Sequence, residues 1–194
     1  MTSSTHEDKG PKFESFVTAE NYSDLAVKTE APVTEEMKER VIAATPIIRE
    51  LMLEQVLLSE KLDVLKKHIF YGKGKCPITE GSYETTAPVA ERITETNIVR
   101  LLHASIGLST ETGEILMALY DHVFNGDKLD EVNLFEEFGD ASWYTGIGCY
   151  VLRKTLAECL QLNIDKLQLR YPEKFTKHSA INRNIESERA LLER

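Results

Sequence analysis

Two apolar helical segments, each interrupted by a pair of acidic residues, constrain the fold of this chain more than any other feature. Apolar positions recur at helical spacing from about residue 97 to 120 and again from about 134 to 153. Glu111 and Glu114 stand three residues apart in the first segment, as do Glu137 and Asp140 in the second. Residues at this spacing share one face of a helix, so each helix carries a paired carboxylate on one face.

Mostly small residues accompany both acidic pairs. Gly107 and Ala118 lie on the stripe of the first pair, while Ala141, Tyr144 and Gly148 share the stripe of the second. Bulky apolar residues fill the remaining sides of both helices, so neither acidic strip can easily face bulk water. The alternative, that these are solvated acids on an exposed face, leaves the apolar flanks unexplained.

Clustered carboxylates repel each other and are costly to desolvate unless a cation neutralises them. Hard divalent cations solve this problem, and Mg²⁺ in particular favours carboxylate oxygens together with the phosphates of a substrate. A di-iron bundle is the natural competitor, but such sites use a Glu-x-x-His motif. Neither acidic pair has a histidine at that place, since His103 and His122 lie a turn or more away. The pairs therefore predict a site for Mg²⁺.

The rest of the chain also reads as helix. An apolar stripe runs from Met37 to Leu65, with Pro46 inside it either starting a new helix or producing a kink. Thr155 offers a capping residue for a further helix that should stop before Pro172, and residues 179 to 194 suit a short surface helix. No segment combines alternation with flanking turns in the manner of a strand. The expected fold class is all-α.

The domain organisation follows from the same patterns. We expect a flexible N-terminal arm at 1–33, an all-α domain at 34–176 and a C-terminal tail helix at 177–194. Glycines, prolines and hydroxyl residues predict a long loop at 71–96 within that domain.

Composition excludes several classes of protein. The net charge of −9 argues against a nucleic-acid partner, which normally requires a basic patch. No apolar run has the length of a membrane span, and the polar N-terminus is unlike a signal peptide. The three cysteines show no C-x-x-C spacing and fit a reducing compartment. We expect a cytoplasmic protein that contacts neither membrane nor nucleic acid.

The acidic pattern resembles the ExxE…ExxD signature of the MazG-like all-α nucleoside triphosphate pyrophosphohydrolases. The similarity continues through LLHASIGLSTETGE, LDEVNLFEEFGDASWY and NIDKLQLRYPEKF, and covers roughly residues 62 to 192. It looks most like versions common in bacteria and their phages, which would place the protein in the host cytoplasm if it came from a phage. The N-terminal arm and most of the loop at 71–96 lie outside it.

This resemblance implies hydrolysis of a (deoxy)nucleoside triphosphate to the monophosphate and pyrophosphate, with purine deoxynucleotides such as dATP and dGTP among the candidate substrates. It also implies two or three Mg²⁺ ions per site, with Mn²⁺ as a substitute, held by Glu111, Glu114, Glu137 and Asp140. Glu136 and Glu137 are the candidate catalytic residues. Glu136 is a candidate extra ligand or general base, and the alternative is a solvated acid.

Asn163, Lys166 and Arg170 match an N-x-x-K-x-x-x-R stretch that lies near the substrate in similar proteins. Cationic donors there could hold phosphate oxygens, while the alternative is the polar face of an amphipathic helix. Trp143 and Tyr144 could stack on a base, although aromatic residues at helical positions more often belong to the core.

The resemblance further implies a MazG-like helical bundle completed by oligomerisation, as a homodimer or a dimer of dimers. Both central helices are apolar on more sides than one chain can cover, which agrees with this expectation. Alternative functions are a non-catalytic, metal-stabilised nucleotide-binding module and a phosphoribosyl-ATP pyrophosphohydrolase.

Overall fold

The structure, a computed structural model, describes residues 16–19, 21–75 and 87–193, and its regular elements are all helices. Within these residues there is no strand, so the all-α prediction is confirmed. The elements are α1 (Tyr22–Val27), α2 (Glu35–Tyr71), α3 (Ala87–Ile93), α4 (Thr96–Tyr120), the π-helical turn η1 (Asp121–Asn125), α5 (Glu131–Val151), α6 (Leu156–Arg170), α7 (Lys177–Ile181) and α8 (Ile185–Leu192). None of the helices in these described ranges is both long and apolar enough to cross a lipid bilayer.

The chain folds as two compact units. One unit, Glu35–Thr155, holds α2 to α5, and the other holds α1 together with α6, α7 and α8. This division falls inside the range 34–176 that the sequence suggested as one domain. Periodicity shows which face of a helix is apolar but not which helices share a core, so the division could not be read from it.

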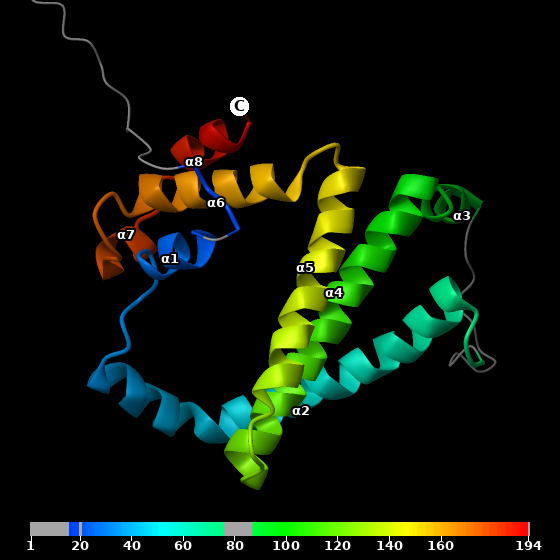
Figure 1. Ribbon diagram of the computed structural model, residues 1–194, viewed down its shortest axis with the longest axis horizontal. Coiled ribbons are helices and arrows are strands. Elements are labelled where there is room, and N and C mark those ends of the chain that lie inside the picture. The colour runs from blue at the N-terminus through cyan, green and yellow to red at the C-terminus, as the bar shows by residue number, and fades with distance from the viewer. Residues whose placement is uncertain (1–15, 20, 76–86, 194) are drawn as a thin grey trace, which may run out of the picture. The chain divides into compact units, whose positions relative to one another are not determined.

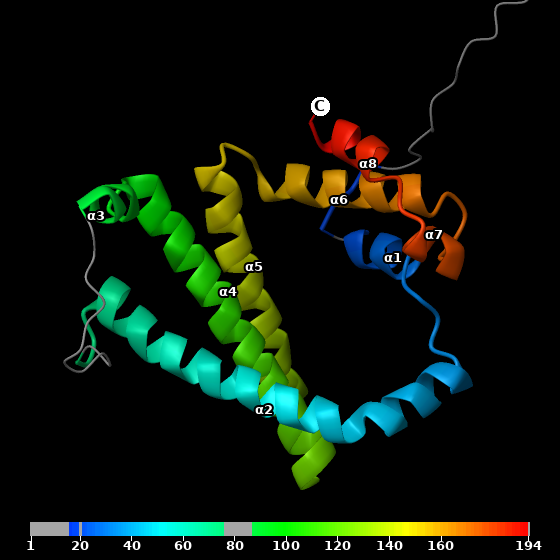
Figure 2. The ribbon, with the colours of Figure 1, turned by 180° about the vertical axis from the view of Figure 1, so that it is seen from behind.

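The first unit is built around α4. Helices α4 and α5 run side by side along their length, and α2 packs across α4 (Figures 1 and 2). Pro46 lies inside α2 and does not begin a new helix, so of the two predicted roles only a kink remains. Figure 1 shows that α2 is bent along its course, as expected where a proline removes one helical hydrogen bond.

Two glycines let the neighbouring helices approach α4 closely. A Cβ atom added at Gly107 would lie 2.2 Å from the ring of Tyr144 on α5. One added at Gly113 would lie 2.2 Å from Cβ of Ser59 on α2, whose hydroxyl donates to the carbonyl of Ser109 at 2.9 Å. Small residues beside the acidic pair therefore serve close packing of both partner helices on α4.

The Gly113→Ala variant is expected to lower the stability of the protein by about 1–3 kcal/mol, because the new methyl group overlaps a Cβ atom that cannot rotate away. Thermal melts monitored by circular dichroism measure this. Gly148→Ala is the matched control, since an added Cβ there meets nothing within 4 Å and alanine is the better helix former. Equal melting temperatures for both variants would show that α2 and α4 are not in this close contact.

Several element boundaries differ from the expected ones. α5 begins at Glu131 and not near residue 134, because Asp130 caps it by accepting hydrogen bonds from the backbone N–H groups of Val132 and Asn133, each at 3.1 Å. The predicted loop at 71–96 contains α3, and the predicted arm at 1–33 contains α1. Both helices are short and lack a long periodic pattern, and residues 1–15, 20 and 76–86 of these segments lie outside the described residues.

In the second unit α6 packs against α1 and α8. Ile164 on α6 is almost fully buried, and Leu191 of α8 is also part of this core. α6 ends at Arg170 and α8 begins at Ile185, so the predicted stop before Pro172 and the predicted helix near the C-terminus are both confirmed.

Candidate metal centre

Carboxylates from α4 and α5 meet at one point in the first unit. Glu111 of α4 and Glu137 and Asp140 of α5 each offer one oxygen atom, and these atoms lie within 4.8 Å of one another. Glu111 and Glu137 are buried, whereas Asp140 is exposed to solvent. Three carboxylate oxygens this close together have the chemistry to hold a metal ion. The structure therefore brings together three of the four predicted ligands.

Glu137 has the most strongly shifted pKa in this group. Burial, the nearby charge of Glu114 and a hydrogen bond with Glu111 together raise its pKa to about 7. Two carboxyl groups can form such a bond only when one of them carries a proton. Burial and the neighbouring carboxylates thus both disfavour the charged form of Glu137, and a bound cation would favour it.

Glu114, the fourth predicted ligand, lies against the same group. Its side chain forms a hydrogen bond with Glu137, and its pKa is raised by burial and by the charges of Glu111 and Asp63. It is more exposed than Glu111, and its oxygen atoms are not among the three that lie closest together.

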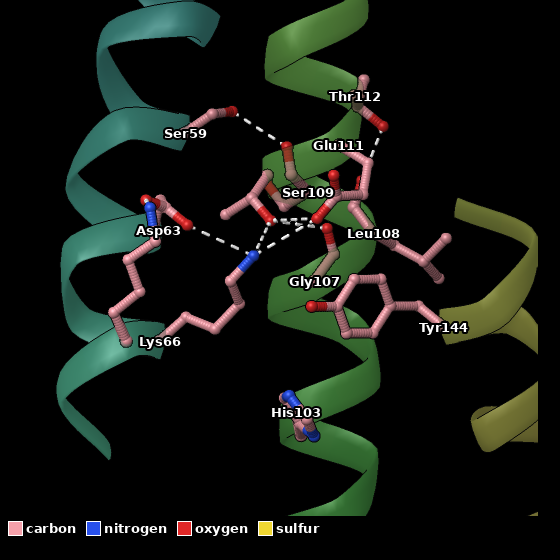
Figure 3. Close-up of polar contacts among 12 residues, drawn as sticks. Ser59, Asp63, Lys66, His103, Gly107, Leu108, Ser109, Glu111, Thr112 and Tyr144 are labelled. Carbon is pink, nitrogen blue, oxygen red and sulfur yellow. Dashed lines mark hydrogen bonds and ion pairs between the residues drawn. The ribbon is translucent and has the colours of Figure 1, made fainter. Parts of the chain in front are cut away.

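A buried lysine from α2 faces the acidic residues of α4 (Figure 3). Nζ of Lys66 donates to Oγ1 of Thr110 at 2.8 Å and to Oε1 of Glu111 at 3.2 Å. It also pairs with Oδ1 of Asp63 at 3.2 Å, and it lies 5.4 Å from the ring centre of Tyr144. Burial alone would lower the pKa of this lysine, but Glu111 and the other partners raise it above its ordinary value. Lys66 is therefore a charged group of the site.

Asp63 and Lys66 were not among the site residues predicted from the sequence. Val56, Ser59, Asp63 and Lys66 follow one another at steps of three and four, which places them on one face of α2. Charged residues on the same face as a buried valine were the available signal. It did not indicate which acid Lys66 would meet, because Glu111 is 45 positions away in the sequence.

A cavity of about 520 Å³ lies between α2 and α4, next to Glu114. Its lining is rich in carboxylates and includes Asn133 at the start of α5. The acidic residues of the lining are Glu60, Asp63, Glu114 and Asp121. A cavity of this size is in the range that small ligands occupy, but its acidic lining would repel a phosphorylated ligand unless cations neutralised it.

Aromatic side chains gather beside Tyr144. The ring of His103 stacks on Phe70 with centroids 4.2 Å apart and meets Trp143 and Tyr144 edge-on at 6.1 and 5.5 Å. Tyr144 is buried against Gly107 and belongs to the core, whereas Trp143 is 56% exposed. Burial and a hydrogen bond with Tyr71 raise the pKa of Tyr144 to about 12.

The remaining predicted site residues lie outside the group of three. Glu136 is exposed on α5 next to Glu137. Asn163, Lys166 and Arg170 are on α6, in the other unit. Oδ1 of Asn163 accepts a hydrogen bond from the hydroxyl of Tyr22 at 3.4 Å. Substrate binding by these α6 residues stays a prediction.

Arg170 is held by an acid of its own unit. Its guanidinium donates two hydrogen bonds to the carboxylate of Glu188 on α8, at 2.8 and 2.7 Å, and Arg183 binds the same carboxylate at 2.6 Å. Because of these bonds, the pKa of Glu188 is lowered to about 2. The pair fastens α8 to the end of α6.

Comparisons of this chain with protein-family models, with curated proteins and with solved structures find no match.

Proposed function

We propose that this chain is a Mg²⁺-dependent nucleoside triphosphate pyrophosphohydrolase of the MazG-like type, which releases pyrophosphate and a nucleoside monophosphate. The observation that carries the proposal is the meeting of Glu111, Glu137 and Asp140, from two helices, within 4.8 Å. The raised pKa of Glu137 adds to it, because perturbed acids cluster at functional sites.

Bound Mg²⁺ would neutralise phosphate charge and acidify a water molecule at such a site. The protein's own residues would bind the metal ion and accept the proton. Glu111, Glu137 and Asp140 would hold the ion, and Glu114 would extend the site toward the adjoining cavity. Glu136, exposed beside Glu137 on α5, is the candidate base that would accept a proton from an attacking water.

The cavity beside Glu114 is the proposed entry point for the nucleotide. Its volume of about 520 Å³ suits a small ligand, and its carboxylates explain why cations must accompany the triphosphate. Carboxylate and amide oxygens in its lining also accept hydrogen bonds, so bases that carry amino groups are suitable ligands. dATP and dGTP, which the family resemblance suggests as substrates, both carry such amino groups and are compared first.

The deciding experiment measures pyrophosphate released from the four deoxynucleoside and four ribonucleoside triphosphates, and from phosphoribosyl-ATP, in millimolar Mg²⁺. Pyrophosphate from one or more nucleoside triphosphates, abolished by EDTA, supports the proposal. Tight nucleotide binding without any product would instead indicate a non-catalytic binding module. Turnover of phosphoribosyl-ATP alone would indicate a phosphoribosyl-ATP pyrophosphohydrolase.

Self-association is the second part of the proposal, and an apolar stripe along α5 supports it. Four large side chains on this stripe are exposed: Val132 (80%), Phe135 (81%), Trp143 (56%) and Tyr150 (67%). Gly139 and Gly146 lie on the same stripe, and a Cβ added at either meets nothing within 4 Å. Contiguous apolar surface of this kind marks an interaction site, and a second copy of the chain is the proposed partner.

The Phe135→Glu variant is expected to dissociate the predicted homodimer or dimer of dimers, because it places a charge on the apolar stripe at one of its most exposed side chains. Analytical ultracentrifugation at micromolar concentration measures the mass. Phe16→Glu is the control, since Phe16 is 91% exposed and belongs to the other unit. A wild-type protein that sediments as a monomer would contradict the proposal, as would a Phe135→Glu variant of unchanged mass.

A further inference from the structure

Lys66 has a position that the proposed chemistry does not account for. It is a buried cation on α2, yet its ammonium group lies against Glu111, an expected metal ligand on α4. We propose that Lys66 is a positioning residue, an internal counter-ion that neutralises and orients Glu111 until a divalent cation binds. This inference rests on the metal site of the proposed function.

The burial of both partners shows that the contact is not a surface ion pair. The side chains of Lys66 and Glu111 are only 6% and 7% exposed. Breaking a buried ion pair by removing one partner leaves an uncompensated charge and is strongly destabilising. Lys66 also donates to Thr110, so its ammonium group is tied to two consecutive residues of α4.

The hydrogen bonds also fix the orientation of the Glu111 carboxylate. Lys66 and the hydroxyl of Thr110 both donate to the same oxygen, Oε1, at 3.2 and 3.0 Å. Oε2 of Glu111 accepts neither of these two hydrogen bonds. Figure 3 shows Lys66 reaching from α2 to this carboxylate, with Asp63 on the same helix. The lysine thereby helps to hold Oε1 in place, while the same carboxylate also forms a hydrogen bond with Glu137 of α5.

The charge of Lys66 has opposite effects before and after a metal ion binds. Without metal it offsets part of the repulsion among Asp63, Glu111 and Glu114, and so it stabilises the fold. A divalent cation bound by Glu111 would meet the same positive charge at short range and be repelled by it. Lys66 should therefore stabilise the metal-free protein and weaken metal binding.

The test is the Lys66→Met variant, which keeps the volume of the side chain but removes its charge. Two readouts that need no turnover are melting temperature, in EDTA and in millimolar Mg²⁺, and Mn²⁺ binding followed by electron paramagnetic resonance. We expect a lower melting temperature in EDTA, a larger increase on adding Mg²⁺ than in the wild type, and Mn²⁺ binding at least about threefold tighter. Lys66→Gln, which keeps a hydrogen-bond donor, replaces it if Lys66→Met does not fold.

Lys67→Met is the matched control, because Lys67 also pairs with Asp63 but is 51% exposed. It should leave both readouts close to those of the wild type. An equal Mg²⁺-dependent gain in wild type and Lys66→Met, or weaker Mn²⁺ binding by the variant, would overturn the counter-ion role. A wild type that binds no Mn²⁺ would overturn the metal site itself, so the two failures are distinguishable.

Discussion

The Asp140→Ala variant is expected to lose nucleotide hydrolysis, with kcat at least about 10³-fold below that of the wild type, while it keeps its fold. Asp140 is exposed, so its loss removes little packing, but it supplies one of the three closest carboxylate oxygens. A site reduced from three to two such oxygens would hold a divalent ion poorly and misplace it relative to the substrate. Pyrophosphate release in saturating Mg²⁺ measures the loss, and circular dichroism checks the fold.

Glu114→Ala should show the same loss, because Glu114 bonds to Glu137 and borders the cavity. Glu131→Ala is the control, because it removes an exposed acid from the first turn of α5, the helix that carries Asp140, away from the group of three. Turnover within about threefold of the wild type in either Asp140→Ala or Glu114→Ala would mean that the site is misplaced.

The sequence could predict this site because its geometry is local. Glu111 and Glu114 share a face of α4 by their spacing, as Glu137 and Asp140 do on α5. The apolar flanks of both helices then indicated that neither acidic strip faces bulk water. Periodicity and the cost of burying charge were sufficient for that inference.

The same reasoning could not predict the contribution of α2. Lys66 reaches Glu111 across 45 positions, and Ser59 reaches Ser109 across 50, so both contacts depend on how α2 crosses α4. Arg170 illustrates the same limit in the other unit. Its place on the polar face of α6 was visible, but the carboxylate of Glu188 that binds it comes from α8, after an intervening turn and helix.

The Glu137→Gln variant is expected to change stability in opposite directions with and without metal. In the metal-free protein Glu137 is buried among Glu111, Glu114 and Asp140, so removing its charge relieves repulsion and should raise the melting temperature at neutral pH or leave it unchanged. With Mg²⁺ the variant lacks one ligand. An ion that binds only the folded state stabilises it by about 2.7 kcal/mol at a hundredfold excess over Kd, and this gain should shrink.

The pH dependence provides an independent readout of the same residue. The pKa of Glu137 in the folded protein is about 7, above its ordinary value of 4.5, so the folded state binds this proton more tightly than the unfolded state does. Stability of the metal-free protein should therefore fall as pH rises from about 4.5 to about 7, and this part of the fall should be missing in Glu137→Gln. The comparison with wild type isolates Glu137 from other titrating groups.

Thermal melts of wild type and Glu137→Gln, each in EDTA and in millimolar Mg²⁺ across this pH range, decide the question. Glu131→Gln is the control, because it removes an exposed acid of the same helix that lies outside the acidic group. If Mg²⁺ raises the melting temperatures of the wild type, Glu137→Gln and Glu131→Gln equally, Glu137 is not a metal ligand. If the wild type and Glu137→Gln also share one pH profile, Glu137 does not carry the proton that its buried, acidic surroundings favour, and the repulsion that motivates a cation here is relieved in some other way.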